Sequence, residues 1–135
     1  FTIKLRKPEW SRNFTLSSRE IQEEKDGYIS ITDVWKEQTL TVDLDVSLRK
    51  EIRNGKTAFL YGDLVLALDN AKNRYDFEQE LDFLGGEILP HEKGEQIRYQ
   101  MTTVAGKKYI FTDYASCGKG WENENSKVSV WLNVK

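Results

Sequence analysis

The sequence predicts an all-β protein, an antiparallel β-sandwich or jelly roll with one short helix or irregular linker. Short runs of alternating apolar and polar residues recur along its 135 residues. Glycines and the pair Asn54-Gly55 separate several of these runs, as expected for strands joined by tight turns. No internal repeat or low-complexity segment breaks the pattern. A two-layer β architecture is therefore expected.

The first half of the chain contains four predicted strands, and alternation begins at the first residue. Strands are expected over 1–6, 14–16, 28–32 and 40–46, each with apolar side chains on one face. Pro8 ends the first of them, because proline lacks the N–H that strand pairing needs. The run 40–46 is the clearest, with leucines and valines opposite threonine and aspartates. One face of this strand should be buried and the other solvated.

The second half begins with the turn Asn54-Gly55 and a nearly continuous apolar run, 58–68. Such a run fits a single central strand covered on both faces, with Gly62 marking a bulge or kink. Residues 69–95 are charged and polar, with apolar residues at helical spacing before Gly85-Gly86, so a short helix or an irregular linker is expected there.

Three further strands are expected after this segment. Gly106-Lys107 should turn the hairpin between the first two. The three strands cover 97–101, 108–112 and 128–134.

Composition excludes several classes of function. Lys and Arg number 20 against 22 Asp and Glu, so phosphate-driven binding of nucleic acid is not expected. No apolar run is long enough to cross a membrane. Cys117 and His91 are the only residues of their types. The chain therefore has no intrachain disulfide and lacks a His/Cys zinc site of its own; no cofactor or metal is predicted.

The chain begins with Phe1 inside a strand pattern, which predicts a single domain, 1–135, cut from a longer protein, with 69–95 as a possible internal linker. Any targeting signal would belong to the missing part. The sequence alone does not fix localisation.

The segment 113–121 is the best candidate for a contact site. It combines polar side chains, a turn of small residues, Cys117 and a tryptophan outside any clean alternation. Two tryptophans at strand ends are added as candidates, because sugar rings stack their C–H faces on aromatic planes. The candidates for contact with carbohydrate or with a neighbouring domain are Asp113, Tyr114, Ser116, Trp121, Trp10 and Trp35.

The sequence supports catalytic residues less well than it supports a contact site. Asp43 and Asp45 are spaced for a carboxylate pair, yet they fall on the face expected to be solvated. Cys117 has no base close in sequence to activate it, and His91 is expected at the surface. No catalytic residue is predicted.

Four segments stand out when they are taken in order: 1–10, 27–35, 58–67, and a last one that joins 113–116 to Trp121 and 130–132. Together they resemble the C-terminal β-sandwich region of glycoside hydrolase family 127, which includes β-L-arabinofuranosidases and many bacterial relatives. With this resemblance, a bacterial cytoplasmic location is favoured over secretion. The resemblance implies that catalysis, a retaining hydrolysis, takes place in an N-terminal (α/α) barrel with a zinc-associated cysteine cluster and glutamates. Cys117 matches a position that is usually small and does not inherit the nucleophile role.

The resemblance thus implies a non-catalytic accessory domain that supports a catalytic domain missing from this chain. A carbohydrate-binding module that holds a glycan through the 113–121 loop is the alternative. An independent hydrolase is a third and weaker hypothesis.

Overall fold

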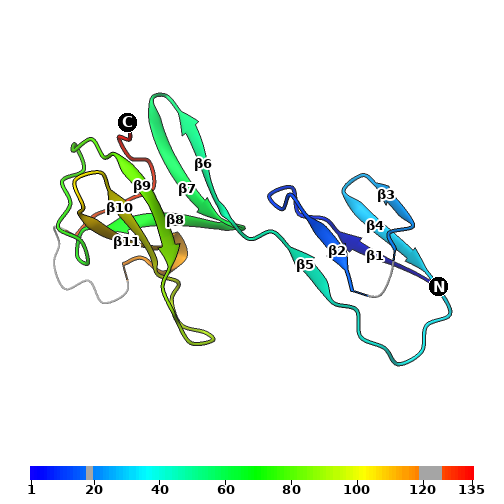
Figure 1. Cartoon of the computed structure of the whole chain (residues 1–135). Helices are drawn as coiled ribbons and strands as arrows, with labels where there is room; N and C mark the ends of the chain where they lie inside the picture. Colours follow the sequence, from blue (N-terminus) through cyan, green and yellow to red (C-terminus); the bar gives the residue numbers. More distant parts are fainter. Residues whose placement is uncertain (18–19, 119–125) are drawn as a thin grey trace. The chain divides into compact units, whose positions relative to one another are not determined.

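The computed structural model describes residues 1–17, 20–118 and 126–135, and it confirms the predicted fold class. Nearly all regular structure is antiparallel β-sheet (Figure 1). The chain divides into two compact units, Phe1–Ser47 and Leu48–Lys135. That the whole chain acts as a single domain stays a prediction, as does a linker role for 69–95, which lies inside the second unit.

The described residues of the first unit form two small antiparallel sheets. One has the order β1-β4-β3 and the other pairs β2 with β5. The turn at Asp26-Gly27 takes positive φ angles at both residues and joins β3 to β4. The strands are β1 (Thr2–Arg6), β2 (Phe14–Leu16), β3 (Glu23–Lys25), β4 (Tyr28–Thr32) and β5 (Val42–Leu44).

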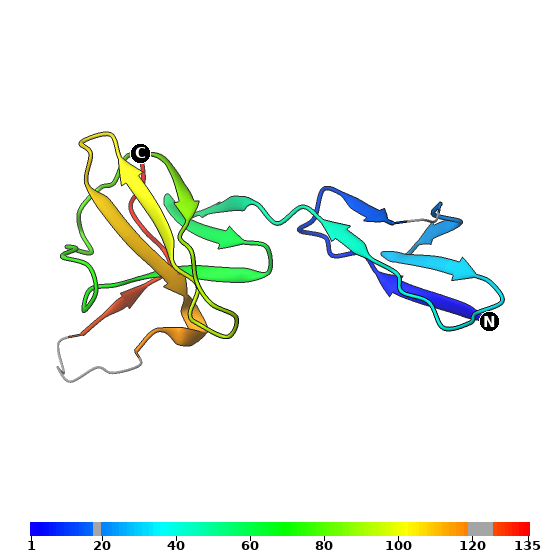
Figure 2. The same ribbon diagram turned by 60° about the horizontal axis from the view of Figure 1, so that its bottom comes forward.

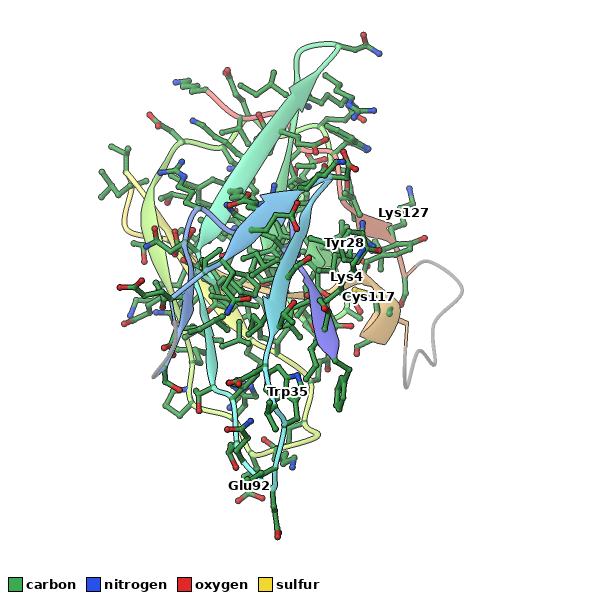
Figure 3. All side chains as sticks on the ribbon, turned by 90° about the vertical axis from the view of Figure 1, so that its right-hand side faces the viewer. Lys4, Tyr28, Trp35, Glu92, Cys117 and Lys127 are labelled. Carbon is green, nitrogen blue, oxygen red and sulfur yellow. The ribbon has the colours of Figure 1, made fainter. Side chains whose placement is uncertain are left out.

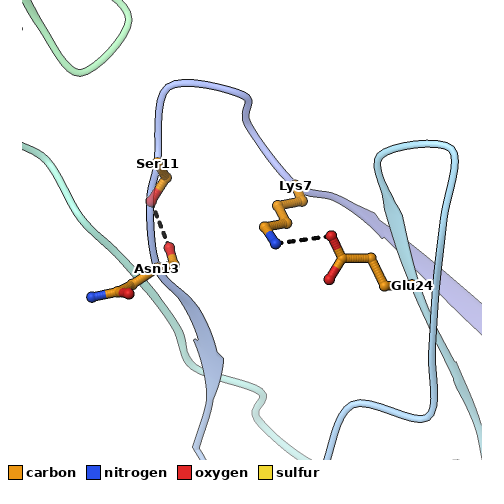
Figure 4. A network of polar contacts seen from close by, with 4 residues as sticks. All are labelled: Lys7, Ser11, Asn13 and Glu24. Carbon is orange, nitrogen blue, oxygen red and sulfur yellow. Dashed lines mark hydrogen bonds and ion pairs between the residues drawn. The ribbon is translucent and has the colours of Figure 1, made fainter.

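The core of the first unit lies between these two sheets. Phe14 of β2 is buried together with Ile29 and Ile31 of β4, and partly buried residues of β1 and β5 pack against them. The predicted alternation in 28–32 therefore places Ile29 and Ile31 in the core as expected. In 1–6, Leu5 alone packs against this core, and Phe1 is 78% exposed. Two polar contacts are drawn in Figure 4: Lys7 Nζ lies 2.8 Å from Glu24 Oε1 at an exposed position, and the buried Ser11 hydroxyl donates to the Asn13 carbonyl.

Within its described residues, the second unit is one curled sheet of seven strands. The order is β6-β7-β8-β11-β10-β9, and β12 pairs with β8 beyond the end of β7 (Figure 2). Thr57 in β7 also exchanges main-chain hydrogen bonds of 2.9 Å with Leu132. The strands are β6 (Leu48–Arg53), β7 (Lys56–Tyr61), β8 (Leu64–Asp69), β9 (Phe83–Ile88), β10 (Tyr99–Thr103), β11 (Lys108–Asp113) and β12 (Val128–Ser129).

Aromatic side chains fill the inside of the curled sheet. Phe59 of β7 makes edge-to-face contacts with Phe83 of β9 and Phe111 of β11, with ring centroids 5.6 and 5.8 Å apart. Because β7 and β9 are far apart in the strand order, this contact requires the sheet to curl around its core.

The prediction of one central strand over 58–68 is wrong. The run forms β7 and β8, joined by a turn at Gly62-Asp63 in which Gly62 has a φ of 59°. The guanidinium of Arg49 donates to the Gly62 carbonyl at 2.9 Å and holds this turn. Both strands are interior to the sheet and apolar, so no polar stretch announces the reversal.

The helix allowed for within 69–95 is absent, although the structure describes this whole segment. Its first part is irregular and its second part is β9, the edge strand beside β10. Asn73 organises the irregular part: its Nδ2 donates to the Asp69 and Ile110 carbonyls, and its Oδ1 accepts from the Ile110 N–H at 2.8 Å. The buried amide thereby pairs with β11 as a neighbouring strand would.

Two adjacent glycines in β9 meet different surroundings. A Cβ on Gly86 would lie 2.5 Å from the Gln100 carbonyl oxygen and 2.6 Å from Tyr99 Cε1, whereas a Cβ on Gly85 would meet nothing within 4 Å. The Tyr99 hydroxyl also donates to the Gly86 carbonyl at 3.2 Å. Packing therefore requires glycine at position 86 but leaves room for a side chain at position 85.

Candidate functional site

Asp113, Tyr114 and Ser116 come together at the end of β11. The chain there forms a single 3₁₀ turn, η1 (Tyr114–Ser116), and Asp113 caps it by accepting a 3.0 Å hydrogen bond from the Ser116 N–H. Gln96 Nε2 donates to the Ser116 carbonyl at 3.3 Å. The short turn is thus fixed from both sides, which leaves the Tyr114 side chain projecting outward.

Tyr114 is 59% exposed and lines a hollow of about 210 Å³ with the β7–β8 turn. Leu64 and Val65 contribute exposed apolar side chains, and Asp63 and Asp113 contribute carboxylates. This Tyr114 patch consists of Asp63, Leu64, Val65, Asp113, Tyr114 and Ala115. Leu64 and Val65 were not predicted as site residues, because the patch depends on a turn that the sequence pattern did not reveal.

Cys117 follows η1 and is labelled in Figure 3. Its Sγ lies 3.6 Å from the Asp113 carbonyl oxygen. Burial raises the pKa of the Cys117 thiol to about 11, and the nearby Asp69 carboxylate acts in the same direction. An activated nucleophile needs the opposite shift. The environment of Cys117 therefore keeps the thiol protonated.

The remaining candidate residues lie elsewhere. Trp10 and Trp35 belong to the first unit and are half-buried. Trp35, labelled in Figure 3, donates from Nε1 to the Phe1 carbonyl at 2.6 Å, and its ring lies 5.9 Å from that of Phe1. These contacts give Trp35 a structural role within its unit. Trp121 lies outside the described residues.

His91 is exposed in the loop between β9 and β10, as expected. Over residues 1–17, 20–118 and 126–135, no three His, Cys, Asp or Glu side chains gather where they could hold a metal ion. Within those same ranges, no helix has the length and apolar character needed to cross a membrane.

A second hollow, of about 320 Å³, lies along the edge of the sheet at β9 and β10. We call it the Gly85 hollow, and it is lined by Leu84, Gly85, Gly86, Glu87, Gln100 and Thr102. No part of it was predicted from the sequence, because it depends on which residues of β10 lie opposite β9.

Comparison with known proteins relates the whole chain to parts of larger hydrolases. No protein-family model matches the sequence, and a search of curated proteins found no match. Among solved structures, a GH127 β-L-arabinofuranosidase from Geobacillus stearothermophilus T6 matches 100% of this chain with a TM-score of 0.75 and 20% identity. A second structure, described as a glycoside hydrolase, matches 99% with a TM-score of 0.75 and 12% identity.

The chain spans only 26% and 28% of those two proteins. The resemblance expected from the sequence is confirmed for the fold. The activity of those enzymes is a property of much longer chains.

Proposed function

We propose that this chain is a non-catalytic β-sandwich accessory module of a family 127-like glycoside hydrolase, and that it supports a catalytic domain outside the present sequence. The observation that carries the proposal is the match of the entire chain to about a quarter of two hydrolases, with TM-scores of 0.75. A fold that occurs as one part of a larger enzyme is suited to an accessory role.

The Tyr114 patch is the surface that we assign to this contact. Leu64, Val65 and Tyr114 expose apolar area side by side, and the capped turn η1 holds Tyr114 in place. Exposed apolar side chains that gather in one patch are typical of contacts between proteins or domains. The carboxylates of Asp63 and Asp113 lie at its rim, where a partner's polar groups can pair with them.

The test uses the reading frame that encodes this chain. The part of that reading frame adjacent to residues 1–135, here called the flanking segment, would be expressed as a separate protein. It would then be mixed with the 135-residue module, and the hydrolysis of aryl arabinosides and other aryl glycosides would be measured. We expect the module alone to be inactive and the flanking segment to gain solubility and activity when the module is added. Tyr114→Ala should weaken this effect, whereas Tyr28→Ala, at an exposed tyrosine outside the patch, should not.

A flanking sequence that does not encode a glycoside hydrolase would overturn the proposal. Turnover of an aryl glycoside by the purified module would also overturn it, in favour of an independent hydrolase.

Carbohydrate binding at the same patch is the second candidate function. It is favoured by the exposed ring of Tyr114 beside the carboxylate of Asp113. Arabinose-containing oligosaccharides would be titrated into the module while tryptophan fluorescence is followed. Saturable binding that is lost in Tyr114→Ala or Trp121→Ala supports this candidate, and no saturable change leaves the accessory role.

A further inference from the structure

Gly85 has no structural reason to be glycine. Its φ lies outside the positive range that favours glycine, and no atom lies within 4 Å of an added Cβ. β9 carries a bulge beside it, because Gly85 lies opposite Thr102 while Phe83 lies opposite Thr103. A bulge without positive φ accepts other residues. Glycine inside a strand also marks places where a ligand approaches the backbone closely.

Strand register places hydrogen-bonding side chains around this glycine. Glu87 lies opposite Gln100, and Gly85 lies opposite Thr102, so all four residues share one face of the β9–β10 pair. The buried Tyr99 and Met101 occupy the other face, toward the core. The missing side chain at 85 therefore opens a depression on the outer face, bordered by a carboxylate, an amide and a hydroxyl.

The depression is firmly framed. Paired strands β9 and β10 form its floor, and the 2.8 Å hydrogen bond from the Leu89 N–H to the Arg98 carbonyl continues their ladder beyond Ile88. The Tyr99 hydroxyl, on the core side of the sheet, donates a hydrogen bond to the Gly86 carbonyl. A site whose floor is already ordered loses little conformational entropy when it binds a ligand.

We propose that the Gly85 hollow binds a neutral saccharide unit. Its volume of about 320 Å³ is large enough for a sugar ring. Glu87 accepts hydrogen bonds, whereas Gln100 and Thr102 both donate and accept, which suits the mixed character of sugar hydroxyls. Leu84, which is 73% exposed at the rim, offers apolar area to the C–H groups of the ring.

The charges around the hollow favour a neutral ligand. Glu87 is the only charged residue of the lining, and it disfavours a uronate or a phosphate. On the same face, β11 places Lys108 opposite Thr102. Lys108 does not line the hollow, but its positive charge on this face disfavours a simple cation. The inference goes beyond the accessory role, because a scaffold needs no sugar contact.

The test is a titration of the isotope-labelled 135-residue chain with L-arabinose, D-galactose and cellobiose, followed by amide shifts in NMR spectra. We expect at least one sugar to cause saturable shifts at Gly85, Glu87, Gln100 and Thr102. In Gly85→Val the added side chain fills the hollow, and valine is a residue type that strands favour. This substitution should weaken binding at least about tenfold. Gln100→Ala should weaken it by a similar factor.

Several outcomes would overturn the inference. They are the absence of saturable shifts with all three sugars, shifts confined to the Tyr114 patch, or unchanged affinity in a folded Gly85→Val. Tighter binding of glucuronate or putrescine than of any neutral sugar would equally overturn it. The complementation experiment on the flanking segment does not involve the hollow, so failure of one proposal is distinguishable from failure of the other.

Discussion

Substituting Gly86 with alanine should destabilise the second unit strongly, although only one methyl group is added. The added Cβ would lie 2.5 Å from the Gln100 carbonyl oxygen, 2.6 Å from Tyr99 Cε1 and 3.0 Å from Met101 Cγ. The first contact is with main chain that belongs to the β9–β10 ladder. To relieve these short contacts, either the edge strand β9 or the Tyr99 ring must move.

The magnitude follows from these two consequences. Forcing an extra methyl into a packed site costs about 1–3 kcal/mol. Displacing Tyr99 also breaks its 3.2 Å hydrogen bond to the Gly86 carbonyl, which adds about 1 kcal/mol. A loss of roughly 2–4 kcal/mol lowers the Tm of a unit of this size by roughly 10–20 °C.

Gly85→Ala is the matched control, because it adds the same methyl group to the neighbouring residue. Its Cβ meets open space, so the free energy of unfolding should stay constant or rise by about 0.4–1 kcal/mol through the reduced entropy of the unfolded chain. Urea unfolding and differential scanning calorimetry of both variants measure the difference.

Equal stability of the two alanine variants would refute this reasoning. So would a Gly86→Ala protein within about 0.5 kcal/mol of the parent, the range usual for surface substitutions. Unchanged NMR signals of the Tyr99 ring in Gly86→Ala would count against displacement of that ring.

Three further predictions concern other parts of the fold. Asn73→Ala removes an amide that bonds to Asp69 and to both main-chain groups of Ile110, so it should cost about 2–4 kcal/mol in urea unfolding; a cost below about 1 kcal/mol contradicts this role. The pKa of Cys117 is about 11 in the folded chain against an ordinary value of 9.0. The protonated thiol therefore stabilises the folded state below pH 9, and this stabilisation is lost as the pH rises toward 11. Iodoacetamide should therefore react with the native thiol at pH 8 at least about tenfold more slowly than with the unfolded one, and equal rates would refute the shift. Glu24→Ala removes the exposed pair with Lys7 and should change stability by less than about 0.5 kcal/mol, whereas a loss above about 1 kcal/mol would contradict that expectation.

The hairpins that depend on local backbone preference could be predicted. Asn54-Gly55 adopts φ angles of 50° and 74° and joins β6 to β7, and Gly106 has a φ of 82° between β10 and β11. Such turns depend on residues adjacent in sequence. The reversal at Gly62-Asp63 was missed because apolar strands continue on both of its sides. Leu64 and Val65, directly after the turn, are exposed although they are apolar, so the run of apolar residues did not reveal where the chain reverses.

Elements and sites that depend on tertiary pairing could not be predicted in the same way. β9 contains two glycines and follows apolar residues at helical spacing, and only its pairing with β10 makes it a strand. The polar cluster at Asp113 and Tyr114 was visible because its members are consecutive. The Gly85 hollow was not, because Gln100 and Thr102 reach it through strand register.

The bond between Thr57 and Leu132 has a consequence for folding during synthesis. A ribosome releases the chain from its N-terminus, so β7 and β8 emerge long before Leu132 can pair with Thr57. Until then, the edge of β7 at Thr57 stays open beside an apolar hairpin, a surface prone to aggregation. Closing so long a loop is also slow. Charged side chains occupy four of the six positions of β6 (Arg49, Lys50, Glu51 and Arg53), and Lys56 adds a fifth at the start of β7. We expect them to limit wrong pairing of the nascent hairpin while its final partner is still being made.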